Sequence, residues 1–284
     1  MSSPESMSLF VDNSTRETTG ESARRSYDPE FFDQLARIES KHFWFRTRNQ
    51  VIATLAQQIT EDWPDGYRVL EVGCGTGNVL RALEQVCSRG IVVGMDLFAE
   101  GLSFARKRTS CALVQGNIEQ SGFGIQFDLI GAFDVVEHLS DDVQVFRAIH
   151  SMLKPGGALL LTVPAHQSLW SYFDEAAHHR RRYGTTDLRS KLIQTGYEIE
   201  FLSQFMASTY PLLWFVRIIK SILRENDNSN SVERHRALSL EELRIVPVLN
   251  GLLTFALTQE ARLIKSRIVL PFGSSLVVVA RRAQ

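Results

Sequence analysis

A glycine-rich turn between an apolar run and an amphipathic segment constrains this sequence more than any other feature. Residues 67–79 read Y-R-V-L-E-V-G-C-G-T-G-N-V, so a short apolar run reaches Glu71 and Val72 and is followed by Gly73, Gly75 and Gly77. Apolar residues then recur at helical spacing. This order predicts a strand, a tight turn and a helix, the opening unit of a doubly wound α/β domain. The glycines allow unusual backbone dihedrals and let a ligand approach closely.

The spacing of these glycines separates two classes of ligand. Dinucleotide-binding folds use G-x-G-x-x-G, whereas this turn reads G-x-G-x-G and has Asn78 at the next position. The spacing therefore argues against a nicotinamide oxidoreductase.

Further apolar runs follow the first one, separated by amphipathic segments of helical period. We expect strands over residues 69–72, 91–96, 111–115, 127–133, 158–163, 197–205 and 276–280. Lys154–Gly157 is expected to form the turn before the fifth of them. The second run ends in Asp96, whose carboxylate offers only acceptors and can bind the hydroxyls of a ribose.

The motif E-x-G-x-G-x-G resembles motif I of the class I S-adenosylmethionine (SAM) dependent methyltransferases in full. The resemblance implies an α/β fold with a doubly wound, mostly parallel, seven-stranded Rossmann-like sheet, N-terminal helices and a helical insertion before the last strand. It also implies that the glycines hold the methionine end of SAM, that Glu71 orients the turn, that Asp96 takes the ribose and that Asn117 and Ile118 flank the adenine. The expected cofactor site consists of Glu71, Gly73, Cys74, Gly75, Gly77, Asp96, Leu97, Asn117, Ile118 and Phe133.

Composition limits the other classes of function. The chain is 44% hydrophobic and 22% charged with a formal net charge of −1, so no basic excess indicates nucleic acid as a partner. Its three cysteines form no C-x-x-C pair, and no signal peptide pattern is visible. These features predict a cytoplasmic protein with buried thiols.

The chain divides into segments of different character. We expect a disordered tail over 1–26, an N-terminal helical lid over 27–62, the SAM-binding α/β core over 63–205, a helical insertion over 206–270 and the final core strand within 271–284. In the lid segment, Arg46 or Arg48 would lie near the methionine carboxylate. The alternative is a helix that docks Phe43 and Phe45 onto the sheet domain.

The expected insertion begins with an apolar stretch, Tyr210–Leu223, which is too short to span a membrane. A second helical pattern, Ser239–Arg267, is expected to be interrupted near Pro247 and Gly251. Three roles remain open for the insertion: packing on the sheet or at a homodimer contact, a cap over a hydrophobic acceptor, or a peripheral helix at the inner membrane face.

Polar residues that could act in chemistry follow the fourth expected strand. Asp134, Glu137 and His138 would share one face if this turn is helical, and together they could hold Mg²⁺ or Zn²⁺. The segment resembles the D/E-x-x-E-H segment of small-molecule O-methyltransferases such as those of ubiquinone biosynthesis, some of which are linked to a divalent metal. In the alternative, the two acids bind the backbone and His138 faces the acceptor.

A second polar cluster follows the fifth expected strand. His166 or His179 could act as a general base there, and Arg181 and Arg182 could hold a phosphate or carboxylate of the acceptor. The alternatives are structural histidines and salt-bridged arginines. The pattern V-P-A-x-x-x-L-W-S…D…H-x-R-R-Y resembles a bacterial methyltransferase subgroup associated with polysaccharide, glycolipid or secondary-metabolite pathways.

These features together predict a SAM-dependent methyltransferase that acts on a small-molecule or lipid- or glycan-linked acceptor. A hydroxyl is the expected methyl acceptor, because the N/D-P-P-Y/F motif of many amino-methylating enzymes is absent: Phe133–Val136 reads F-D-V-V. The alternative is a SAM-binding partner or regulator of another enzyme that performs no chemistry itself.

Overall fold

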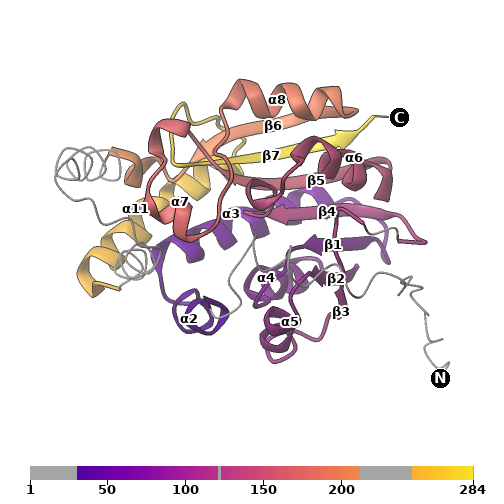
Figure 1. Ribbon diagram of the computed structural model, residues 1–284, viewed down its shortest axis with the longest axis horizontal. Coiled ribbons are helices and arrows are strands. Elements are labelled where there is room, and N and C mark those ends of the chain that lie inside the picture. Colours follow the sequence, from indigo (N-terminus) through magenta and orange to yellow (C-terminus); the bar gives the residue numbers. More distant parts are fainter. Residues whose placement is uncertain (1–30, 121–122, 212–244, 284) are drawn as a thin grey trace.

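A seven-stranded sheet forms the centre of the computed structural model, which describes residues 31–120, 123–211 and 245–283. The strand order is β3-β2-β1-β4-β5-β7-β6, with β3 at one edge and β6 at the other (Figure 1). The strands are β1 Arg68–Val72, β2 Ile91–Asp96, β3 Ala112–Gln115, β4 Phe127–Phe133, β5 Leu153–Pro164, β6 Tyr197–Phe205 and β7 Ser275–Arg282. Strands β1 to β5 pair in parallel, and β7 runs antiparallel to both β5 and β6. The expected mostly parallel seven-stranded sheet is confirmed.

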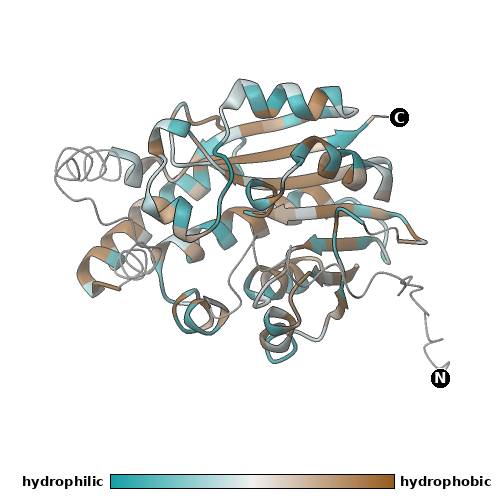
Figure 2. Ribbon diagram, in the orientation of Figure 1, coloured by the Kyte–Doolittle hydropathy of each residue, from teal (hydrophilic) through white to brown (hydrophobic). Residues whose placement is uncertain are grey.

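Helices cover both faces of this sheet because neighbouring strand residues point to opposite sides. Val69 packs in one hydrophobic core with α3, α4 and α11, whereas Leu70 packs in a second core with α6 and α8. Figure 2 shows hydrophobic residues concentrated along the central strands. The helices are α2 Phe31–Ile38, α3 Phe43–Thr60, α4 Asn78–Val86, α5 Ala99–Ala105, α6 Asp142–Met152, α7 Tyr172–Ala176, α8 Thr185–Gln194 and α11 Pro247–Lys265, with short 3-10 helices η1 Val136–His138, η2 Gln167–Leu169 and η3 Ala207–Thr209.

Strand β5 begins earlier than its sequence indicates. The expected turn over Lys154–Gly157 lies inside the strand, where Gly156 has a φ of +73° and the register against β4 shifts. Asp128 of β4 fixes this irregular stretch, since its carboxylate accepts hydrogen bonds from Lys154 Nζ at 2.7 and 2.8 Å and from the Arg68 amide at 2.8 Å. The K-P-G-G sequence therefore makes a bulge rather than a loop.

Helix α11 packs against α3 and so joins the expected insertion to the N-terminal segment. Asn250 Oδ1 accepts a hydrogen bond from the Phe43 amide at 2.8 Å, and Asn250 Nδ2 donates one to the Lys41 carbonyl at 3.1 Å. Gly251 lies within α11 and does not interrupt it, whereas Pro247 begins the helix, where a missing amide hydrogen costs nothing. The part of the expected helical pattern over 239–244 lies outside the described residues.

The side of α11 that faces away from α3 is apolar and exposed at Val248, Leu252, Phe255 and Leu263.

No helix in the described part of the chain combines the length and apolar character that crossing a membrane requires. The expected tail over 1–26 and most of the Tyr210–Leu223 stretch lie outside the described residues.

The close approach of Gly77, which precedes α4, to Ala105 at the end of α5 gives a test of the fold. Gly77 has a φ of +76°, and an added Cβ would lie 2.8 Å from Ala105 Cα, whereas Gly156 has a φ of +73° and open space around its Cβ position. Gly77→Ala should lower the free energy of unfolding by about 2–4 kcal/mol, and Gly156→Ala by only about 1 kcal/mol. Chemical denaturation of the cofactor-free variants measures both changes. Equal losses of unfolding free energy in the two variants would show that the contact of Gly77 with α5 does not contribute to stability.

Candidate active site

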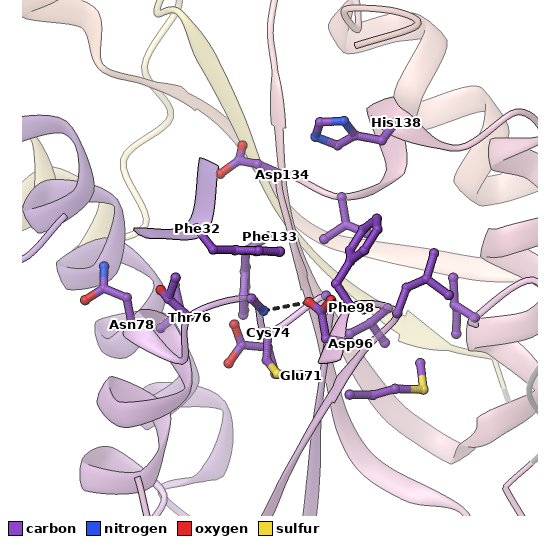
Figure 3. A pocket seen from close by; sticks show the side chains of 18 of the residues that line it. Phe32, Glu71, Cys74, Thr76, Asn78, Asp96, Phe98, Phe133, Asp134 and His138 are labelled. Carbon is purple, nitrogen blue, oxygen red and sulfur yellow. Dashed lines mark hydrogen bonds between the residues drawn. The ribbon is translucent and has the colours of Figure 1, made fainter. Parts of the chain in front are cut away.

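A cavity opens at the carboxyl ends of β1, β2 and β4, where open α/β sheets bind their ligands (Figure 3). Its walls come from the glycine turn after β1, from the ends of β2 and β4 and from the segment after β3. Helices α2 and α3 close it on another side through Phe32, Leu35, Glu39, Phe45 and Arg48. Of the expected cofactor residues, those that line the cavity are Glu71, Gly73, Cys74, Gly75, Asp96, Leu97, Asn117, Ile118 and Phe133.

The glycine turn shapes the floor of this cavity. Gly73 has a φ of +68°, and a Cβ there would lie 2.5 Å from a methyl carbon of Val135. Gly75 has a φ of +50°, and its Cβ position meets only the Phe32 ring at 3.6 Å. The turn thus brings bare backbone to the cavity. Gly77 does not line the cavity. It lies instead against Ala105 at the end of α5.

Asp96 connects the end of β2 to the glycine turn. Its Oδ2 accepts a hydrogen bond from the Gly75 amide at 2.7 Å (Figure 3). Its Oδ1 accepts one from the Phe98 amide at 2.8 Å. The side chain is 6% exposed, and this burial raises the pKa of Asp96 to about 6. At neutral pH it is a fixed carboxylate with free lone pairs for a ligand's hydroxyl groups.

Burial disfavours the charged form of two further groups at the turn, Glu71 and Cys74. Burial raises the pKa of Glu71 well above its usual range, and it also raises the pKa of the Cys74 thiol. Cys74 is therefore a thiol rather than a nucleophilic thiolate, as its place in the tight turn suggests.

Helix α2 is attached to the glycine turn by a polar contact that sequence reasoning missed. Glu39 Oε1 accepts hydrogen bonds from Thr76 Oγ1 at 2.6 Å and from Arg108 Nη1, while Arg108 Nη2 donates to the Ala36 carbonyl at 2.8 Å. Glu39 is buried despite its charge. No local pattern connects these residues, since they come from three separate elements.

Arg48 is the arginine of the expected lid that lines the cavity, whereas Arg46 is exposed. Arg48 Nη1 donates to Asp134 Oδ2 at 2.8 Å, and its guanidinium lies 4.9 Å from the centre of the Trp44 ring. Asp134 has a φ of +55°, a left-handed conformation that turns the chain directly after β4. Asp134 is therefore drawn toward α3.

Glu137, His138 and His179 lie together beside the cavity. One ligand-type atom from each lies within 4.8 Å of the others, and the two imidazole rings are perpendicular with centres 4.8 Å apart. His138 lines the cavity itself. Glu137 is 0% exposed, and burial together with the charge of Asp134 raises its pKa well above the usual range. The structure thus groups His179, rather than Asp134, with Glu137 and His138.

The loop after α7 brings His179 to this position. The Arg180 amide donates to the Glu137 carbonyl at 2.8 Å, and Arg180 Nε donates to the His138 carbonyl at 3.0 Å. His179 Nδ1 lies 2.9 Å from Asp174 Oδ1, which also accepts from Arg182 Nε at 2.7 Å. Although burial opposes it, the hydrogen bond from His179 and the charge of Arg182 lower the pKa of Asp174 below its usual value.

The remaining polar residues that the sequence indicated lie elsewhere. His166 Nε2 is 2.6 Å from Gln204 Oε1, and His166 takes no part in lining the cavity. Arg181 pairs with Asp142 at 3.0 Å, and Arg182 is buried against Asp174. Both arginines are salt-bridged, and neither lines the cavity.

Comparison with known proteins identifies the family of this chain. The family model described as "Methyltransferase domain" matches residues 41–201. The chain belongs to this methyltransferase family. A probable S-adenosylmethionine-dependent methyltransferase of Mycolicibacterium smegmatis is 27% identical over 167 residues, a match that covers 57% of this chain and 62% of the relative. The chain thus spans less than two thirds of that relative's length.

Two further methyltransferases show how far the similarity extends. A malonyl-[acyl-carrier protein] O-methyltransferase of Enterobacter lignolyticus is 30% identical over 188 residues, covering 61% of this chain and 73% of that protein. In the complex between the Haloferax volcanii Trm112 methyltransferase activator and a putative methyltransferase, one chain matches with a TM-score of 0.55. That match has 16% identity and covers 89% of this chain and 98% of the other, so it shows the shared fold.

The Mycolicibacterium smegmatis relative is named as dependent on S-adenosylmethionine, and the cavity of this chain fits that cofactor chemically. Gly75 leaves the floor of the cavity free of side chains, and Asp96 presents acceptors suited to a ribose. Leu97, Ile118 and Phe133 supply apolar walls of the kind that an adenine ring packs against.

The contact of α2 with the glycine turn can be tested by hydrogen–deuterium exchange. Glu39→Ala leaves Thr76 and Arg108 without their shared acceptor, so amides of α2 should exchange about tenfold faster or more. Asp33→Ala is the matched control, because it removes only the exposed ion pair of Asp33 with Arg37 on the same helix. Exchange that is equally fast in both variants would contradict a specific role of Glu39.

Proposed function

We propose that this chain transfers the methyl group of S-adenosylmethionine to a hydroxyl group of a small molecule or of a small group carried on a lipid or glycan. The observation that carries the proposal is that the glycine turn, Asp96 and His138 line one cavity. The bound cofactor supplies a methyl group on a sulfonium, which is transferred by in-line displacement. The chain must then hold the two reactants in line and accept a proton from the hydroxyl.

The cofactor roles follow the geometry of the cavity. The backbone of Gly73–Gly75 approaches the methionine end, and the buried Glu71 lies beneath this turn. Asp96 accepts hydrogen bonds from the ribose hydroxyls, and Asn117 and Ile118 lie beside the adenine. Arg48, on the wall formed by α3, is placed to attract the methionine carboxylate while it remains paired with Asp134.

His138 is the histidine that contacts the acceptor. Among the three histidines that the sequence indicated, it lines the cavity, while His179 lies behind it and His166 is tied to Gln204. A neutral imidazole in this position can take the proton that a hydroxyl loses on methylation. The O-methyltransferase named among the relatives supports oxygen as the methylated atom.

Methyl transfer from radiolabelled S-adenosylmethionine to a panel of small hydroxyl compounds tests the proposal directly. His138→Ala should lower kcat by about 100-fold or more, the usual contribution of a general base, while cofactor affinity stays unchanged. His178→Asn is the control, since His178 lies on the neighbouring loop but outside the cavity. Cofactor binding without turnover on any hydroxyl acceptor would favour a non-catalytic binding protein, and equal losses in both variants would remove His138 from the site.

The buried carboxylate of Asp96 predicts a pH dependence of cofactor binding. Ribose hydroxyls donate to the ionised carboxylate, so binding favours loss of the Asp96 proton, and affinity should rise with pH through about 6 and then level off. Calorimetric titration should show affinity about tenfold lower at pH 5 than at pH 8.

Substitutions at Asp96 separate this effect from other titrating groups. Asp96→Ala should weaken binding by about 1–3 kcal/mol, because the ribose hydroxyls lose their acceptor. Asp96→Asn keeps an oxygen acceptor but cannot ionise, so its affinity should show no rise between pH 5 and pH 8. A pH profile that persists in Asp96→Asn would assign the effect to another residue.

A further inference from the structure

The carboxylate of Glu137 occupies an unusual position for an acid. Its side chain is 0% exposed, and neither of its oxygens has a hydrogen-bond partner among the residues that the structure describes. A buried carboxylate without partners is costly, so such groups in folded proteins usually coordinate or pair with a cation. Glu137 faces His138 and His179, whose ring nitrogens provide further ligand atoms.

The hydrogen bonding of His179 also indicates a cation site. Its Nδ1 lies 2.9 Å from the Asp174 carboxylate, which is also held by the Ser171 amide at 2.9 Å and by Arg182 at 2.7 Å. With Nδ1–H donated to Asp174, the lone pair of Nε2 points toward Glu137 Oε1, 3.9 Å away. That distance is too long for a hydrogen bond. Two acceptor atoms therefore face each other across a gap.

We propose that Glu137, His138 and His179 form a binding site for a divalent transition-metal cation, with Asp174 as the residue that orients His179. A carboxylate that holds the second nitrogen of a metal-binding histidine is a common arrangement in metal sites. Ligand atoms about 2.0–2.2 Å from a zinc ion lie roughly 3–3.5 Å from one another. The three groups, now within 4.8 Å of one another, need to close by at most about 1.3–1.8 Å.

The donor set selects the kind of cation. Two imidazole nitrogens and one carboxylate favour Zn²⁺, Mn²⁺ or Co²⁺, whereas Mg²⁺ prefers an all-oxygen environment. Asp134 is excluded from the set because its Oδ2 is bound to Arg48. The cation site thus differs from the Asp134, Glu137 and His138 set that the sequence spacing indicates.

The proposed site adjoins the cavity of the proposed methyl transfer, because His138 lines that cavity. A bound cation would supply Lewis-acid activation of the acceptor hydroxyl. His138 is then a ligand in the metal-loaded protein and a proton acceptor in the metal-free protein. This role in catalysis rests on the proposed function, whereas the binding of the cation does not.

Titration of the full-length, chelator-dialysed chain with Co²⁺ and Zn²⁺ tests the site without reference to turnover. We expect one ion per chain by calorimetry, a visible absorption spectrum for Co²⁺ and a higher Tm with metal. Glu137→Gln and His179→Asn should weaken binding by roughly 100-fold or more, and Asp174→Asn by about 10–100-fold. Glu137→Gln should also lose the metal-dependent rise in Tm without losing stability in the absence of metal, since it replaces a buried carboxyl group whose oxygens have no hydrogen-bond partner among the described residues.

Two variants serve as matched controls. His178→Asn changes the neighbouring histidine of the same loop, and Asp134→Asn changes the acid that the sequence pattern favours; both should bind Co²⁺ like the wild type. The Tm in the absence of metal identifies the variants that remain folded. If the wild type binds neither ion, or if His178→Asn weakens binding as much as His179→Asn, the proposal is overturned. Dependence on Asp134 but not on His179 would also overturn it.

Failure of S-adenosylhomocysteine to bind the wild type would instead contradict the proposed function and leave the metal result standing.

Discussion

The hydrogen bond from the Gly75 amide to the Asp96 carboxylate is the contact on which the cavity depends. It joins the turn after β1 to the end of β2, and the Phe98 amide holds the second oxygen of the same carboxylate. Because Asp96 is almost fully buried, its charge would be costly without these two donors. The turn therefore has a fixed shape before any ligand binds, which reduces the ordering that binding requires.

Buried polar contacts then attach the remaining walls to this centre. Glu39 ties α2 to Thr76 in the glycine turn, and Arg48 ties α3 to Asp134 at the end of β4. Opening the α2 wall must separate buried polar partners and must also expose Phe32, whose ring packs against Phe98. On the far side of the cavity, Asp174 and Arg182 hold His179 behind His138.

Local sequence predicted the elements because each depends on residues close together in the chain. Asp141 caps α6 by accepting a hydrogen bond from the Gln144 amide three residues later, and Gly196, with a φ of +93°, follows the end of α8. Local signals failed where a partner strand or helix decides the outcome. The K-P-G-G stretch forms a bulge because β4 pairs with it, and Gly251 lies inside α11 without interrupting the helix.

The sequence by itself determined the sheet, the glycine turn and the acid at the end of β2, because strand period, glycine spacing and strand ends are local properties. Tertiary structure decided which polar side chains meet. Asp134, Glu137 and His138 are neighbours in the chain, yet the left-handed backbone at Asp134 and its pairing with Arg48 draw it aside. His179 joins the other two through hydrogen bonds of Arg180 to the carbonyls of Glu137 and His138. Such contacts between distant segments depend on how the loops fold onto the sheet, which residue spacing does not record.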